Sequence, residues 1–422
     1  MRDFIIIALV LVGCLAALRQ PWYGVLVWVW LSLMNPHRYS YGPAYDAPLA
    51  AMAVASTMIG LLVTKDKLNP FKQPPMVMLV IFVLWLTASW ALGLDPEDDY
   101  DQWKKVVKVY FMVFVSLALI INRKQILVFS WVTTASLAIL GMKGGIFTVI
   151  TGGSYRVWGP PDTFIEDNNE FALALIMTVP LMRFLQTQSS NLWVRRFLTV
   201  GMLLLVASGL GSYSRGALLA SLAMSAVIWW RGTDRLRNGL IFVVVGLLLV
   251  GFMPEQWGNR MSTIETYEQD DSAMGRISAW WTAFNYAKDH LLGAGFNLAR
   301  PELFAKYSPL PESVHAAHSI YFQVLGNHGF VGLFWFLMIG ALTWKTAADI
   351  RRISANKPEL SWCYEMGGMC QCSMVAYTIG GAFLSLAYFD LPYYVMVMLL
   401  ATRRWLTLQG HDKPKPAAVV PL

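Results

Sequence analysis

The stretch PMVMLVIFVLWLTASWALGL, residues 75–94, runs for twenty residues without a charged side chain. A helix of that length measures about 30 Å, which matches the hydrocarbon thickness of a bilayer. Inside lipid the backbone must satisfy its own hydrogen bonds, so such a segment is helical. Lys72 precedes the stretch and the acidic segment 95–101 follows it. The sequence here predicts a transmembrane helix with one basic and one acidic end.

Apolar runs of this kind fill most of the chain. Apolar residue types make up 56% of the sequence and charged residues only 14%, against about 25% charged residues in a typical soluble domain. The 18 Trp and 17 Tyr residues fit two interfacial belts. Besides 75–94, runs lie near 4–18, 22–34, 47–63, 103–121, 125–150, 169–186, 196–212, 215–230, 238–252, 318–346, 364–388 and 391–406. We predict an all-α fold, a polytopic transmembrane helical bundle.

The first two runs leave the position of the N-terminus open. Each is short for a span, and Arg19-Gln-Pro21 separates them. Two crossings would place the N-terminus outside, whereas a broken or re-entrant pair that crosses once would place it inside. We expect the single net crossing, which gives about twelve spans.

Basic and acidic loops alternate along the chain. Lys and Arg side chains gather in every second loop, at 65–72, 123–124, 195–196, 231–237, 345–357 and 403–404. The intervening loops are acidic or nearly neutral, at 95–102, 151–168, 211–215, 253–317 and 389–392. The positive-inside rule places the first set in the cytoplasm and the second in the periplasm. The net charge of +7 therefore reflects membrane topology, and no basic domain for nucleic acid is predicted.

Four regions follow from this pattern. Residues 1–252 are predicted to form transmembrane helices with short loops, 318–410 the C-terminal transmembrane helices, and 411–422 a disordered tail. The long polar segment, 253–317, falls on the periplasmic side. Within it Ile277, Trp280, Trp281 and Phe284 recur at helical spacing. That spacing predicts an amphipathic helix that lies on the membrane surface or caps a cavity.

Three arginines on the predicted outer side are candidates for binding anions. Arg215 lies in a very short turn, Gly211-Ser-Tyr-Ser-Arg-Gly216, and begins a predicted span. Arg276 opens the amphipathic helix, and Arg156 lies in the loop 151–168. Arginine remains charged and grips phosphate oxygens in a bidentate manner, and a helix N-terminus favours anions. The plain alternative at each position is a snorkelling or solvated side chain.

Two histidines stand where the outer segment enters a span, in Val314-His-Ala-Ala-His-Ser319. Histidine is the side chain best suited to accept a proton near neutral pH, which makes His318 a candidate base. The alternative is a polar tip at the membrane interface. His328 lies ten residues later, and we expect it to be a buried packing residue.

Other polar residues suggest binding rather than metal chemistry. Asp167 or Asn168 can cap the next span or hydrogen-bond sugar hydroxyls. Lys143 lies near the outer end of its span, where we expect it to snorkel. His315 and His318 lack a clear third ligand, and the single residue between Cys370 and Cys372 does not fit a zinc site. We therefore expect no metal and no cofactor.

These motifs resemble a known family. HSIYFQVLGNHGFVG (318–332) resembles the signature of the O-antigen ligase and polymerase superfamily, in which a His precedes an aromatic and Leu run and a Gly-x-x-Gly. Ser-Arg-Gly at 214–216 resembles its outer-side Arg motif. Gly275-Arg276 and the segment 289–295 resemble its large periplasmic loop, and Asp167-Asn168 matches a further feature. Ser319 replaces the more common Asn.

The resemblance implies a metal-independent, inverting glycosyltransferase with a helical bundle of the GT-C kind and a periplasmic cavity, in a bacterial inner membrane. In the ligase branch, O-antigen moves from undecaprenyl diphosphate to lipid A-core oligosaccharide, and we assign the chain to that branch. His318 would act as the base, and Arg215 and Arg276 would stabilise the leaving diphosphate. Substrate contacts would come from Arg156, Asp167, Asn168, His315 and Ser319.

Two other branches share these motifs: the O-antigen polymerases and the protein O-oligosaccharyltransferases. A transporter for the same lipid is a further alternative, because intramembrane charges mark substrate pathways. Here the charges of interest lie on one face, with no chain of ionisable groups through the spans, which favours an enzyme.

Overall fold

The computed structural model describes residues 2–232, 234–262 and 271–412, and over these residues the regular secondary structure is helical, without strands. All thirteen predicted apolar runs are helices: Arg2–Arg19 (α1), Trp22–Met34 (α2), Leu49–Val63 (α3), Pro74–Ala91 (α4), Tyr100–Leu119 (α5), Arg123–Ile150 (α6), Asn168–Gln188 (α7), Leu192–Gly211 (α8), Arg215–Arg231 (α9), Arg235–Phe252 (α10), Ile320–Ser354 (α14), Ser361–Gly381 (α15) and Asp390–Leu408 (α16). The segment between α10 and α14 adds Glu255–Ser262 (α11), Asp271–Asp289 (α12) and Pro301–Tyr307 (α13). Short 3₁₀ turns occupy Pro36–Tyr39, Pro70–Lys72 and Pro358–Leu360. The predicted disordered tail lies outside the described residues from position 413 onward.

Six of the described helices have the length and apolar composition of a membrane span, namely α4, α6, α7, α8, α10 and α14. Helices α2 and α3 are apolar but shorter. The all-helical membrane bundle is therefore supported, while the number of about twelve spans stays a prediction.

The N-terminus differs from the expected single net crossing. A Cβ atom on Gly13 would touch Val27, and one on Gly24 would touch Ala17, so α1 and α2 run antiparallel. The Asp3 carboxylate accepts hydrogen bonds from the Gly42 and Ala44 N–H groups, at 3.1 and 3.2 Å. The chain thus returns to the end at which it started. A turn at Gln20-Pro21 closes this hairpin. The two short helices therefore run in opposite directions instead of forming one interrupted span.

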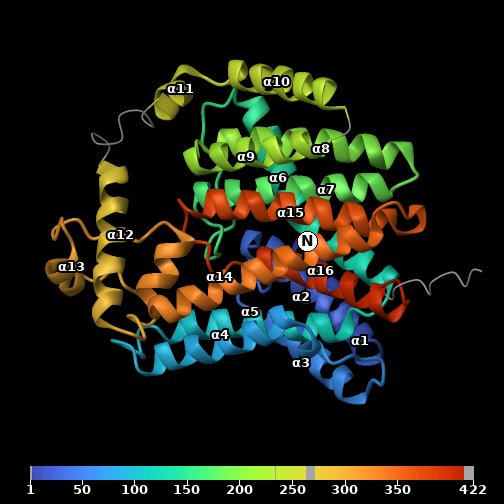
Figure 1. The fold of residues 1–422 in the computed structure, drawn as a ribbon, viewed down its shortest axis with the longest axis horizontal. Coiled ribbons are helices and arrows are strands. Elements are labelled where there is room, and N and C mark those ends of the chain that lie inside the picture. Colours follow the sequence, from blue (N-terminus) through green and yellow to red (C-terminus); the bar gives the residue numbers. More distant parts are fainter. Residues whose placement is uncertain (1, 233, 263–270, 413–422) are drawn as a thin grey trace, which may run out of the picture.

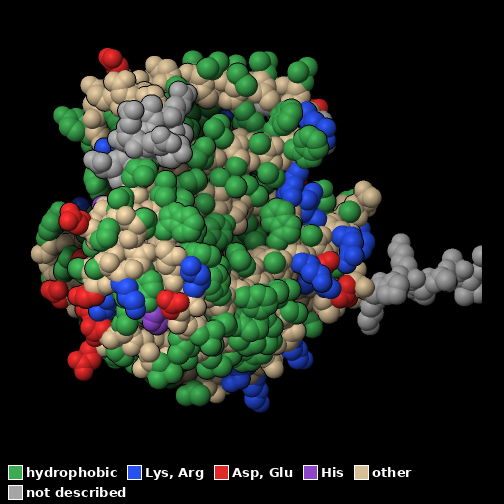
Figure 2. Space-filling model, turned by 60° about the vertical axis from the view of Figure 1, so that its left-hand side comes forward, with side chains coloured by type: hydrophobic (Ala, Val, Ile, Leu, Met, Phe, Trp, Pro, Cys, Tyr) green, Lys and Arg blue, Asp and Glu red, His purple; other side chains and the backbone are tan. Residues whose placement is uncertain are grey.

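Loops that were predicted to share a side of the membrane do meet at one end of the bundle. The Phe296 N–H donates to Asp99 at 2.6 Å, and the Arg300 guanidinium lies 3.4 Å from Asp95. At the opposite end, Arg404 donates to the Leu117 carbonyl at 2.6 Å. Figure 2 shows most of the visible acidic side chains at the left-hand end, together with some basic ones, a group of mainly basic side chains at the right-hand end, and hydrophobic ones between. We call the end with loops 92–99 and 151–167 and with the segments 253–262 and 289–319 the outer end.

The N-terminal hairpin can be placed relative to these ends. Arg38, which follows α2, forms a salt bridge with Asp162 at 3.3 Å, and the Tyr45 hydroxyl donates to the same carboxylate at 3.1 Å. Since Asp162 belongs to the loop 151–167, the N-terminal segment lies at the outer end.

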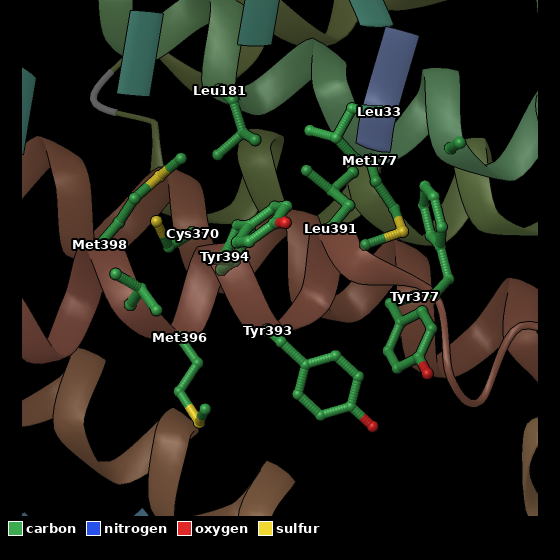
Figure 3. Packing of buried hydrophobic residues seen from close by; sticks show 14 of the residues in the cluster. Leu33, Met177, Leu181, Cys370, Tyr377, Leu391, Tyr393, Tyr394, Met396 and Met398 are labelled. Carbon is green, nitrogen blue, oxygen red and sulfur yellow. The ribbon is translucent and has the colours of Figure 1, made fainter. Parts of the chain in front are cut away.

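Helices α7 and α16 form the centre of the core. Most of the apolar stretch of α7 is buried, at 83%, and so is every residue of α16 from Tyr393 to Thr402. Figure 3 shows Met177 and Leu181 of α7 facing Leu391 and Tyr394 of α16. A side chain at the start of α7 is therefore held in a rigid, dry environment.

The predicted amphipathic helix is α12. In Figure 1 it runs across the left-hand end of the bundle, at a steep angle to the long helices. Its apolar face packs on the first part of α14, where Trp280 stacks on Phe322 with ring centroids 5.1 Å apart. Trp281 remains about half exposed, at 53%. This arrangement fits a helix that lies along the membrane surface.

Helix α14 is broken at Gly329, whose backbone adopts φ 69° and ψ −176°. The outer segment passes through the break, and a Cβ atom at position 329 would collide with the Leu291 carbonyl. The Ala294 N–H donates to the Gly326 carbonyl at 3.0 Å, and the Gly295 N–H to the Asn327 carbonyl at 2.9 Å. These bonds satisfy carbonyls that the break has freed and fix the first part of α14 at the outer end.

Candidate active site

The turn at 380–387, between α15 and α16, is the meeting point of four helices at the outer end. It contacts Gly216 at the start of α9 and Ile320 at the start of α14. The Ser385 N–H, within the turn, donates to the Glu170 carboxylate at the start of α7. The Phe383 ring, also in the turn, lies 6.5 Å from Trp280 of α12. Three of these contacts lie at helix N-termini, those of α7, α9 and α14. Helix N-termini carry a partial positive charge, so their convergence suits an anionic substrate.

His318 immediately precedes α14 and faces this meeting point. Its backbone adopts φ 41°, a left-handed conformation that is uncommon outside glycine. The preceding residue is held by α12, because the Trp280 indole N–H donates to the Ala317 carbonyl at 2.6 Å. The His318 side chain is 38% exposed, and its Nδ1 lies 3.8 Å from Oε1 of Glu170. A partly open imidazole on a strained, anchored backbone is typical of functional positions.

Glu170, in the first turn of α7, was missed as a functional residue by the sequence analysis. Its side chain is only 8% exposed. One oxygen accepts the Ser385 N–H at 3.3 Å, while the other is buried without a hydrogen-bond partner among the described residues. Ser319 Oγ, next to His318, is likewise buried and unsatisfied there. Buried unsatisfied polar atoms are rare in native proteins, and two flank one histidine here.

The neighbouring Asp167 and Asn168 have structural partners. Asp167 is the N-cap of α7, as the sequence indicated, and accepts the Asn169 N–H at 2.8 Å. Burial alone would raise the pKa of Asp167, but hydrogen bonds with Glu170 and Asn169, together with nearby His318, hold that pKa below its usual value. The Asn168 amide donates to the Ser212 carbonyl at 2.5 Å. Asn168 thus ties the start of α7 to the turn before α9.

That turn presents Arg215 as the first residue of α9. Ser214 caps the helix by accepting the Ala217 N–H at 3.2 Å. Tyr213 adopts φ 61° and donates its hydroxyl to the Gly153 carbonyl at 2.7 Å. The exposed Arg156 guanidinium lies 5.8 Å from the centre of the Tyr213 ring. The structure therefore brings Arg156 and Arg215 to the same turn.

Arg276 and His315 belong to the α12 side of the site. A Cβ atom on Gly275 would lie against the His315 ring, so the first half of α12 touches the segment that leads to His318. Arg276 is half-buried and His315 is exposed. A small hollow of ≈ 80 Å³ adjoins this segment, and its lining includes His315, Gln323 and Ser385.

Metal ligands do not gather anywhere in the described part of the chain, where no three His, Cys, Asp or Glu residues form a group able to hold an ion. The four cysteines are buried and unbridged. Metal independence stays a prediction. Lys143, which we expected to snorkel, lies with its Nζ 4.7 Å from the centre of the Tyr39 ring.

The lining of a second hollow at the outer end, ≈ 290 Å³ in volume, includes three lysines of α5 and three carboxylates: Lys104, Lys105, Lys108, Asp101, Asp162 and Asp390. None of the three lysines forms a salt bridge with another described residue. Its lining also includes Thr163–Ile165, just before α7, and Phe389, just after the 380–387 turn. Phe389 is four residues from Ser385, a separation of at most about 14 Å.

Two family models match parts of the chain. Residues 200–337 match the O-antigen ligase family, and residues 1–190 match a family of unknown function. No curated protein matches the chain. The first match contains Arg215, Arg276 and His318, whereas Glu170 lies within the second. Residues 200–337 thus carry an O-antigen ligase domain, which supports membership of the O-antigen ligase superfamily.

Proposed function

We propose that the protein is an inverting glycosyltransferase of the ligase branch. It transfers O-antigen polysaccharide from undecaprenyl diphosphate to lipid A-core oligosaccharide at the periplasmic face of a bacterial inner membrane. The family match supports glycosyl transfer of the ligase or polymerase type. The observation that carries the proposal is the position of His318, partly exposed beside Glu170 where the starts of α7, α9 and α14 meet.

His318 is the general base in this proposal. Its imidazole accepts the proton of the acceptor hydroxyl as that oxygen attacks the anomeric carbon. Attack occurs on the face opposite the diphosphate, so the new glycosidic bond has inverted configuration as the bond to the diphosphate oxygen breaks. General base catalysis of this kind contributes about 10²–10⁴-fold in rate.

The arginines stabilise the leaving group. Cleavage of the sugar–diphosphate bond adds negative charge to the diphosphate, which Arg215 and Arg276 neutralise, with Arg156 as a further contact. Fixed positive groups at the place where charge develops are worth about 10²–10³-fold each. The partial charge at the N-terminus of α9 adds to that of Arg215. The prenyl chain stays in the bilayer, and undecaprenyl diphosphate leaves by lateral diffusion.

The lysine-lined hollow supports an acceptor that carries phosphate, as the lipid A-core does, over a protein or an uncharged growing glycan. Its three ammonium groups form no salt bridge with described residues and can bind an anion, although Asp101, Asp162 and Asp390 line the same hollow. Phe389, in the wall of this hollow, is four residues from Ser385, whose N–H contacts Glu170.

The test is glycan transfer by the purified protein from a lipid-linked donor to each candidate acceptor. We expect transfer to a phosphorylated lipid A-core, and slower transfer to the same acceptor after phosphatase treatment. Lys105→Gln should raise the acceptor KM and leave the donor KM unchanged. Transfer to a peptide or to a second donor glycan instead would assign the protein to another branch. Transport of the donor without any transfer would contradict an enzymatic function.

A further inference from the structure

We propose that Glu170 is the positioning residue of His318. Its carboxylate accepts a hydrogen bond from Nδ1–H of the imidazole and thereby leaves Nε2 as the basic nitrogen that faces the acceptor hydroxyl. This inference rests on the proposed function, because it assigns a partner to the proposed base.

The geometry selects the nitrogen. Of the two ring nitrogens of His318, Nδ1 is the one 3.8 Å from Oε1 of Glu170. That separation exceeds a hydrogen bond, but catalytic hydrogen bonds are often long in the absence of substrate and shorten when it binds. A proton on Nδ1 excludes one from Nε2 in the neutral ring, so the carboxylate fixes the reactive tautomer.

Burial makes this carboxylate rigid. Glu170 projects from the first turn of α7, the most buried of the six apolar spans, and the Ser385 N–H holds one of its oxygens. The other oxygen is buried and lacks a donor among the described residues. Oε1, the oxygen that the Ser385 N–H holds, is also the one 3.8 Å from Nδ1 of His318, so this backbone bond fixes the acceptor beside the imidazole.

The neighbouring Asp167 lies close to both Glu170 and His318, but it serves as the cap of α7. Asp167 accepts hydrogen bonds from both the backbone and the side chain of Asn169, each at 2.8 Å, and so acts as the helix cap. Glu166 is exposed and accepts the Asp162 N–H at 2.9 Å. Among the three carboxylates near the start of α7, Glu170 is thus the one that is both buried and directed at the base.

In the reaction the acceptor hydroxyl gives its proton to Nε2 as its oxygen bonds to the anomeric carbon. The imidazolium that forms carries one positive charge, and the Glu170 carboxylate stabilises that charge without taking the proton. Because this interaction strengthens only as the imidazolium forms, its loss should lower kcat and leave donor binding unchanged.

The test variant is Glu170→Gln, measured by single-turnover transfer with the enzyme in excess. Glutamine keeps the shape and an oxygen for the Ser385 N–H, so a purely structural role would survive the change. We expect kcat to fall about 10–100-fold, by analogy with the loss caused when the carboxylate partner of a metal-bound histidine is removed, with the donor KM unchanged. Glu166→Gln is the matched control and should retain the parental rate.

A double variant separates positioning from structure. If Glu170 acts through His318, Glu170→Gln should cause no further loss in a His318→Gly background. Multiplied losses, or a Glu170→Gln variant at the parental rate, would overturn the positioning role while the base assignment stands. A His318→Gly variant at the parental rate would instead remove the proposed function. If Glu170→Gln does not fold, Glu170→Asp can replace it, because aspartate withdraws the carboxylate by one methylene. No further loss in the His318→Gly background would support the positioning role, and multiplied losses would overturn it.

Discussion

Two histidines of one chain segment, ten residues apart, show how environment separates chemistry from packing. His318 precedes α14, is 38% exposed and has one nitrogen 3.8 Å from a buried carboxylate. His328 lies at the break of α14 and is 0% exposed. Its Nδ1 lies 2.9 Å from Ser89 Oγ, and its Nε2 lies 2.7 Å from the Tyr388 hydroxyl.

A histidine can act as a base only if one of its ring nitrogens is accessible and free to accept a proton. Both nitrogens of His328 are already hydrogen-bonded, and no solvent or substrate reaches them. Its bonds join α4, α14 and the loop before α16, so its role is structural, as expected from the sequence. His318 has an open side and stands at the junction of several helix N-termini. We therefore expect removal of His318 to lower the transfer rate and removal of His328 to lower the stability of the fold.

The largest effect is expected for His318→Ala. Transfer should fall about 10³-fold because the base is lost, while membrane insertion and donor binding remain. The measurement is the single-turnover rate together with binding of the lipid-linked donor. His315→Ala, three residues earlier, is the control and should cost much less. Equal rates for the His318→Ala and parental proteins would contradict the base assignment.

A smaller loss is expected for Arg215→Lys. Lysine keeps the charge but not the planar fork that grips two phosphate oxygens, so kcat should fall by about 10²-fold. Arg276→Lys should lower kcat by a smaller factor. The assay is donor turnover at saturating acceptor. Parental rates for both lysine variants would mean that these side chains do not clamp a diphosphate.

His328→Ala should change stability more than chemistry. The substitution leaves a cavity and removes two buried hydrogen bonds, which together cost about 2–4 kcal/mol of folding free energy. The thermal unfolding midpoint in detergent should fall, and the rate per folded molecule should stay within a few-fold of the parental rate. A large loss of rate in protein that melts normally would give His328 a catalytic role and break the comparison.

Chelation should have no effect. The guanidinium groups supply the positive charge that a divalent ion would otherwise bring to the leaving diphosphate, and they would repel such an ion. Transfer in nanodiscs should be equal with and without EDTA. Activity that EDTA removes and Mg²⁺ restores would replace the arginine mechanism and turn attention to Asp167 and Glu170.

Much of the fold was predictable from local sequence. Each of the thirteen apolar runs is a helix, and the alternation of loop charge correctly grouped the loops at two ends of the bundle. Both signals can be read from short stretches of sequence, because the bilayer fixes the length of a span and the charge of the loops on each side. The N-terminal hairpin was not predicted correctly. Its direction depends on close approaches such as Gly13 with Val27, which hydrophobicity does not encode.

The site was predictable only where motifs are contiguous. Arg215, Arg276 and His318 lie in recognisable segments, and the structure places them on elements at one end of the bundle. Glu170 and the 380–387 turn were missed, because their part in the site comes from contacts across more than 140 residues of sequence. An acidic residue in the first turn of an otherwise apolar span was the available signal.

Chemical rescue of His318→Gly tests most directly whether the His318 imidazole is the general base. Glycine accepts the left-handed backbone at position 318 without strain, so this variant removes the imidazole and keeps the conformation. Because the side chain is partly exposed, free imidazole can enter the space it leaves. We predict that imidazole restores part of the transfer rate in a saturable manner, whereas N-methylpyrrole, which lacks a basic nitrogen, does not. A His318→Gly protein that binds donor but gains no activity from imidazole would contradict the account.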